Sequence, residues 1–160
     1  MKMIELHENG LDIRFRIREN GVVELADFSS QEVKKAIMEP KEDICYPAVE
    51  IHRSGTGSLN MHAYKNNINQ SSADFVYENH ELKAQAGGKE LEIVMVSPEK
   101  LKAVYHMRLF DGVPAVQTWT EIINEGSEDQ GLTYVSSFMY QGISRGGEKP
   151  YYKKTDIYVP

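Results

Sequence analysis

The sequence predicts an all-β protein, an antiparallel β-sandwich of about ten strands with one short helix. Segments of alternating apolar and polar residues recur along the chain. Clusters rich in glycine, asparagine or proline separate them roughly every eight to twelve residues, a spacing typical of sandwiches and barrels. Strands do not alternate with long helices, so no parallel sheet is expected.

Three strands are predicted at the start of the chain, at residues 3–7, 11–17 and 22–28. Asn9-Gly10 and Asn20-Gly21 separate them, and Asn-Gly is favoured in tight hairpin turns because it accepts positive φ. The second strand has an apolar face and a mostly basic face. Its arginines could bind an anion, but charge commonly protects an edge strand, so we expect a solvated edge here.

One short helix is predicted at residues 29–39, where Ser29 and Glu32 have the spacing of a capping box and Pro40 ends the pattern. A strand is expected at residues 48–53. The polar residues 60–72 predict a loop.

The second half of the chain predicts further strands. Residues 74–86 indicate a hairpin that turns near residues 78–80, and a strand follows at residues 91–96. Residues 101–143 carry the strongest signal, a three-stranded antiparallel meander with turns at Asp111-Gly112 and at residues 124–131. A last strand is expected at residues 155–159.

The length and the net charge of the chain restrict the class of protein. We interpret the 160 residues as a single domain, and the formal net charge of −6 argues against nucleic acid and anionic membranes as partners. The single cysteine, Cys45, excludes an internal disulfide. No apolar run approaches the ~18 residues of a membrane span, and the N-terminus does not resemble a signal peptide. We therefore expect a cytoplasmic protein.

No catalytic motif is recognisable, so no catalytic residue, metal site or cofactor is predicted. The serines lack a nucleophile elbow, and the acidic pairs are adjacent in sequence rather than on separate elements that face one pocket. Five histidines show no metal-ligand spacing: His7, His52, His62, His80 and His106.

Trp119 is the single tryptophan and lies within a predicted strand. An aromatic ring on a sheet face is a usual platform for a sugar ring, and it is also a usual filler of a sandwich core or a domain interface. Packing is the favoured interpretation, and sugar contact is the alternative.

A family resemblance rests on the strands and turns after residue 100. In order come residues 105–110, residues 112–116, Trp119-Thr120-Glu121-Ile122, the turn Asn124-Glu125-Gly126, and the pair Ser136-Ser137. This succession resembles the N-terminal domain of glycoside hydrolase family 36, the α-galactosidases. Asp43, followed after three residues by Pro47-Ala48, also resembles that family, although the usual preceding glycine and intervening arginine are replaced by Glu42 and Cys45.

The resemblance implies a β-supersandwich, two large antiparallel sheets face to face. Residues 1–160 would then be the truncated N-terminal portion of a longer enzyme whose catalytic barrel is absent from this chain. The parent would hydrolyse terminal α-galactosides, and the chain alone would be inactive. The resemblance also implies oligomer contacts and a share in the substrate entrance, with Asp43 as the candidate sugar contact.

Two alternatives remain open at this stage. One is a stand-alone carbohydrate-binding sandwich with a concave aromatic face built from Trp119 and one or more of Tyr105, Tyr134 and Tyr140. The other is a mutarotase-like sugar epimerase, which needs a histidine (His52, His62 or His106) close to a glutamate (Glu50 or Glu121).

Overall fold

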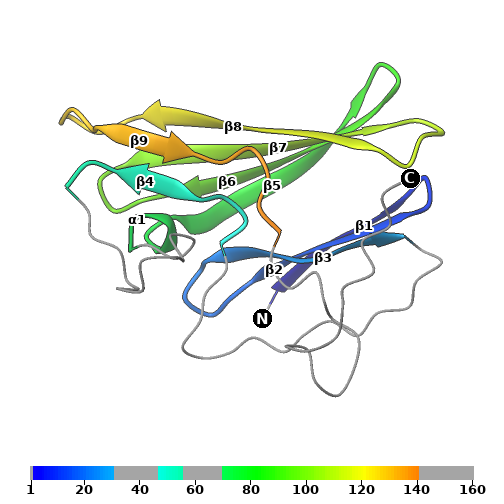
Figure 1. The fold of residues 1–160 in the computed structure, drawn as a ribbon, viewed down its shortest axis with the longest axis horizontal. Coiled ribbons are helices and arrows are strands. Elements are labelled where there is room, and N and C mark those ends of the chain that lie inside the picture. The colour runs from blue at the N-terminus through cyan, green and yellow to red at the C-terminus, as the bar shows by residue number, and fades with distance from the viewer. Residues whose placement is uncertain (1, 31–46, 56–69, 141–160) are drawn as a thin grey trace.

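The structure, a computed structural model, describes residues 2–30, 47–55 and 70–140. Within these ranges three antiparallel sheets account for all the strands, which confirms the predicted all-β class (Figure 1). The elements are β1 (Lys2–Glu8), β2 (Leu11–Ile17), β3 (Val23–Ser30), β4 (Ile51–Arg53), α1 (Gln70–Ala73), β5 (Val76–Gln85), β6 (Gly88–Val96), β7 (Leu101–Phe110), β8 (Val116–Asn124) and β9 (Leu132–Val135).

The first sheet has the order β1-β2-β3, as the sequence predicts. Asn9 and Gly10 take φ values of 51° and 85° in the turn between β1 and β2, which confirms the tight hairpin. The Asn9 side chain also donates to the Phe110 carbonyl at 2.8 Å and accepts from the Gly112 amide at 3.0 Å. It thereby joins this hairpin to the turn between β7 and β8.

The basic face of β2 differs from the prediction. β2 is the central strand of its sheet, so its arginines do not guard an edge. Arg16 is only 8% exposed, and its Nε donates to Glu24 on β3 at 2.9 Å. Arg18 binds the other oxygen of the same carboxylate at 3.1 Å. Buried charges of this kind require such partners.

The second sheet has the order β5-β6-β7-β8. β5 is one continuous strand, so the hairpin predicted near residues 78–80 is wrong. A register shift between Tyr77 and Asn79 marks a β-bulge, which accommodates an extra residue without reversing the chain. The reversal comes at Ala86-Gly87, directly before β6.

The third sheet corrects the meander predicted for residues 101–143. β7 and β8 pair along their length, but β9 leaves β8 and pairs with β4, with Ile51 opposite Val135. The connection between β7 and β8 is also longer than a two-residue turn, because β7 ends at Phe110 and β8 begins at Val116.

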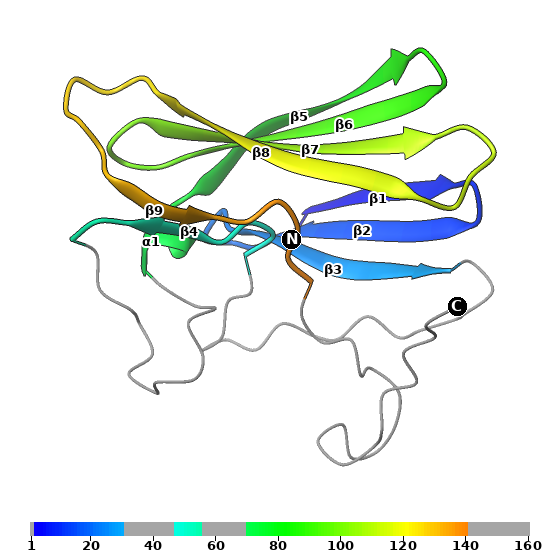
Figure 2. The same ribbon diagram turned by 45° about the horizontal axis from the view of Figure 1, so that its top comes forward.

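The core lies between the first and second sheets, which Figure 2 shows as two layers. Ile13 and Phe15 of β2 point toward the second sheet, and the Phe15 and Tyr105 rings meet edge to face at 5.7 Å. Fully buried aliphatic residues of β6 and β7, each worth about 1.5–3 kcal/mol, complete the packing: Leu91, Ile93, Leu101, Met107 and Leu109.

The helix is also placed differently from the prediction. Ser29 and Ser30 belong to β3, and the rest of the predicted helix lies outside the described residues, as does the strand predicted at residues 155–159. Within the described ranges the helical residues are those of α1, in a stretch predicted to be loop. No helix in these ranges is long and apolar enough to cross a membrane.

Candidate functional site

Trp119 lies on the outer face of the second sheet, on β8. Its neighbours Thr118 and Thr120 are paired with the core residues Met107 and Tyr105, so they face inward and Trp119 faces outward. The indole is partly exposed and stacks on the His106 imidazole, with ring centroids 4.6 Å apart and planes 4° from parallel. Trp119 therefore does not fill the sandwich core.

His106 stands at the centre of a group of carboxylates. Its Nδ1 is 3.0 Å from Glu90 Oε1 and 3.9 Å from Glu92 Oε1, and its Nε2 is 3.8 Å from Glu121 Oε1. Although it lies on the outer face, His106 is only 7% exposed. Its Nε2 is buried and makes no hydrogen bond with the part of the chain that the structure describes. We call Glu90, Glu92, His106, Trp119 and Glu121 the outer-face cluster.

Strand register assembles this cluster. Glu90 and Glu92 are two residues apart on β6 and so share a face. Glu92 is paired with His106 on β7, and His106 is paired with Trp119 on β8. Lys83 of β5 reaches the same group and binds Glu92 at 2.5 Å. The hydrogen bond raises the pKa of Lys83 above its usual value.

His52 and Glu50 form a second histidine–glutamate pair, with Nε2 and Oε1 2.7 Å apart. The structure therefore brings together two of the pairs considered for an epimerase, His52 with Glu50 and His106 with Glu121; His62 lies outside the described residues. In each pair the two groups are within 4 Å of one another. These distances do not show whether either pair could act on a sugar, so the epimerase alternative stays a prediction.

The aromatic face considered for a sugar-binding module is not assembled. Tyr105 is buried in the core, on the opposite side of the sheet from Trp119. Burial raises the pKa of the Tyr105 hydroxyl, and the hydrogen bond with Thr118 only partly opposes this. Tyr134 on β9 packs against His52, and Tyr140 packs against Phe28. Trp119 is the one member of that group on the outer face.

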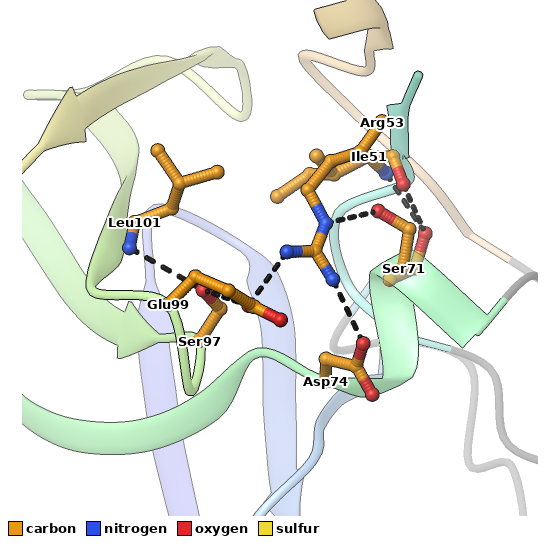
Figure 3. Close-up of polar contacts among 8 residues, drawn as sticks. Ile51, Arg53, Ser71, Asp74, Ser97, Glu99 and Leu101 are labelled. Carbon is orange, nitrogen blue, oxygen red and sulfur yellow. Dashed lines mark hydrogen bonds and ion pairs between the residues drawn. The ribbon is translucent and has the colours of Figure 1, made fainter. Parts of the chain in front are cut away.

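Arg53 forms a buried polar junction between β4, α1 and the turn after β6 (Figure 3). Its guanidinium donates to Ser71 Oγ at 3.0 Å, Asp74 at 2.9 Å and Glu99 at 2.6 Å. Burial acts to raise the pKa of Glu99, but hydrogen bonds from Arg53, its own amide and Ser97 outweigh it, so the pKa is lowered. Because three partners bind the guanidinium, we interpret Arg53 as structural.

A hollow of about 520 Å³ adjoins this junction, between residues 98–100 and residues 125–130. Glu99, Glu125 and Glu128 contribute carboxylates to its wall. Two of them are already paired, Glu99 with Arg53 and Glu125 with Lys102. The hollow is thus a space between two loops, and two of these three carboxylates are salt-bridged.

The two predicted sugar contacts have different outcomes. Asp43 lies outside the described residues, and its role stays a prediction. Trp119 is described and partly exposed, and its sugar contact stays a prediction too. Glu90 and Glu92 could not be recognised from the sequence as partners of His106, because only the alignment of β6 with β7 places them together.

Comparison with solved structures reveals a related fold. The α-galactosidase AgaA of glycoside hydrolase family 36 from Geobacillus stearothermophilus superposes with a TM-score of 0.50 and 13% sequence identity, over 79% of this chain and 23% of that chain. The chain shares its fold with part of this α-galactosidase. A variant of the same enzyme in complex with raffinose gives a TM-score of 0.49 and 12% identity, over 78% of this chain and 22% of that chain.

The chain thus spans about a quarter of the length of the enzyme it resembles. No protein-family model matches the sequence, and no curated protein matches it either.

Proposed function

We propose that this chain is a non-catalytic β-sandwich domain of an α-galactosidase-like glycoside hydrolase, placed N-terminal to a catalytic barrel. The shared fold, which covers 79% of this chain but only 23% of the enzyme, carries the proposal. The order of strand and turn motifs in the second half of the sequence supports it independently. The parent enzyme would act in the cytoplasm on terminal α-galactosides of the raffinose type.

The expected roles are to pack on the barrel, to contribute contacts in a homo-oligomer and to shape the substrate entrance. A retaining glycosidase needs two carboxyl groups about 5–5.5 Å apart on either side of the scissile bond. Several of the carboxylates that the described residues gather are held by partners instead: Glu90 by His106, Glu92 by Lys83, and Glu99 by Arg53. This arrangement favours a supporting domain over a hydrolytic one.

A second candidate function is direct sugar binding at Trp119. His106 covers one face of the indole, and the partial exposure of Trp119 leaves apolar surface for a sugar ring. One aromatic ring is a small platform, so the supporting role remains our main proposal.

The purified chain should leave an aryl α-galactoside uncleaved, and calorimetric titration with galactose and raffinose should give no binding heat. A mock purification from the same host without this chain measures contaminating hydrolase. Hydrolysis above that background would overturn the supporting role. Sugar binding that Trp119→Ala abolishes, without a change in the melting temperature, would establish the second candidate instead.

The coding sequence after residue 160 tests the placement directly. We expect it to continue in frame into a (β/α)₈ barrel with two catalytic aspartates. A stop codon there would contradict the proposed arrangement.

A further inference from the structure

We propose that Glu90, Glu92 and His106 form a binding site for one divalent transition-metal ion, with zinc as the ion that fits best. Each of the three residues offers one ligand atom, and these atoms all lie within 4.8 Å of one another. The proposal is independent of the hydrolase assignment. It concerns the outer face of the second sheet only.

The distances agree with zinc geometry. Zinc bonds to nitrogen and oxygen are about 2.0–2.2 Å long, so two ligand atoms of a tetrahedral ion lie roughly 3.3–3.6 Å apart. The separations of 3.0 Å and 3.9 Å between His106 Nδ1 and the Glu90 and Glu92 oxygens lie on either side of this range. Small rotations of the two carboxylates reach it, and water would occupy the fourth position.

The unsatisfied nitrogen of His106 supports the proposal. If Nδ1 donates its proton to Glu90, Nε2 is left as a buried acceptor without a hydrogen bond. A metal on Nδ1 requires the other tautomer, in which Nε2 carries the proton and faces Glu121 at 3.8 Å. The Glu121 side chain is 57% exposed and free to close that distance. A carboxylate behind the ligating imidazole is the usual support of a metal-bound histidine.

Trp119 restrains the imidazole of His106, which is one of the proposed metal ligands. Its indole lies parallel to the imidazole at 4.6 Å, which limits rotation of the His106 ring. A ring held in one plane loses less conformational entropy when it binds an ion.

The local charge also favours a divalent cation. On this part of the outer face, strand pairing gathers the carboxylates of Glu81, Glu90, Glu92 and Glu121 with two cations, Lys83 and Arg108. The excess of two negative charges is the charge that one divalent ion neutralises. Lys83 already binds Glu92, so it is a competitor that the ion must displace.

The ligand types distinguish between metals. Magnesium and calcium prefer sites made wholly of oxygen atoms, whereas an imidazole with carboxylates suits zinc and its neighbours in the first transition series. Cobalt(II) serves as a spectroscopic substitute for zinc. Because Trp119 is the single tryptophan, quenching of its emission reports directly on an ion bound to His106.

The test titrates tag-free protein with zinc against a chromophoric chelator, and with cobalt(II) while Trp119 emission is followed. We expect one ion per chain. His106→Gln and Glu92→Gln should each weaken binding about tenfold or more. The Glu92 side chain is 22% exposed, against 8% for His106, so the second variant is expected to fold even if the first does not. Lys83→Gln should tighten binding several-fold, because it removes the competing cation.

His52→Gln is the matched control, since among the described residues His52 contacts a single carboxylate, that of Glu50. This variant should bind zinc as the unmodified chain does. The proposal is overturned if the unmodified chain binds no zinc, if His106→Gln and Glu92→Gln bind it equally well, or if Lys83→Gln weakens binding. In the last case the cluster is a structural ion-pair network only.

Discussion

Single residues decide whether the strands of the second sheet can approach one another. Gly88 is the first residue of β6 and is paired with Phe110 of β7. A Cβ atom at Gly88 would lie 1.9 Å from the carbonyl oxygen of Leu109. Backbone atoms cannot move aside as the end of a flexible side chain can. Glycine is therefore required here by the close contact of two strands.

Gly88→Ala should lower the free energy of unfolding by about 3 kcal/mol, because the added methyl group forces β6 and β7 apart at this end. Gly87→Ala is the control: Gly87 has φ of +76°, but a Cβ atom there meets nothing within 4 Å. Backbone strain alone should cost about 1–2 kcal/mol. Urea denaturation measures both values, and equal losses would show that the contact with Leu109 is unimportant.

Trp119 shows what the sequence could reveal about one residue and what it could not. The alternation along β8 is clear in the sequence. It does not show which face is buried, the one with Thr118 and Thr120 or the one with Trp119. Hydrophobicity favours the tryptophan for the core, and the structure places the threonines there. Their hydroxyl groups have partners, since Thr118 bonds to Tyr105 and Thr120 donates to the Ser136 carbonyl at 2.9 Å. Only the register with β7 settles the choice.

At the scale of elements, the Arg53 junction connects segments that share no strand pairing. The guanidinium joins β4 to the end of α1 through Asp74 and to the turn after β6 through Glu99. Ser72 of α1 extends this connection, because its hydroxyl accepts from the Ile51 amide and donates to the Ile51 carbonyl. A helix of four residues is unstable alone, and these contacts hold it in place.

The Arg53 junction should make the free energy of unfolding depend on pH in the acidic range. The pKa of Glu99 is lowered in the folded chain from an ordinary value of 4.5. The contribution of Glu99 to the free energy of unfolding is therefore fully present above about pH 4.5. It is lost as the pH falls through the pKa of Glu99 in the folded chain. Glu99→Gln should reduce the loss of stability between about pH 6 and pH 3.5.

Urea midpoints at those two pH values measure the effect. Glu5→Gln, the same chemical change at an exposed position on β1, is the control. If Glu99→Gln loses as much stability on acidification as the unmodified chain, Glu99 does not carry this dependence.

Some of the secondary-structure elements could be predicted from the sequence and others could not. β1, β2, β6 and β7 have strong alternation and definite turn residues, and each was predicted close to its observed bounds. β5 was predicted as a hairpin because Glu78 and Asn79 are polar, and a single sequence cannot distinguish a bulge from a turn. The junction and the outer-face cluster were not predicted, since their members are brought together by pairing between strands.

At the scale of the whole molecule, the two large sheets and their shared core follow from the pattern of apolar residues. The predicted antiparallel β-sandwich agrees with the observed sheets, and the chain shares its fold with part of an α-galactosidase. The third sheet could not be predicted, because β4 and β9 are short and their pairing joins distant parts of the chain. Short strands carry little periodicity, and the sequence contains no turn that marks them as partners.

The pairing of β4 with β9 has a consequence for folding. Glu50 and Ser136 are hydrogen-bonded across 86 residues of sequence, while the strands of the two larger sheets are joined to their neighbours by short connections. Closing so long a loop costs entropy that local hairpins do not incur. We expect the amide of Glu50 to gain protection in pulsed hydrogen exchange after the amides of β6 and β7. Simultaneous protection would mean that the three sheets form in one concerted step.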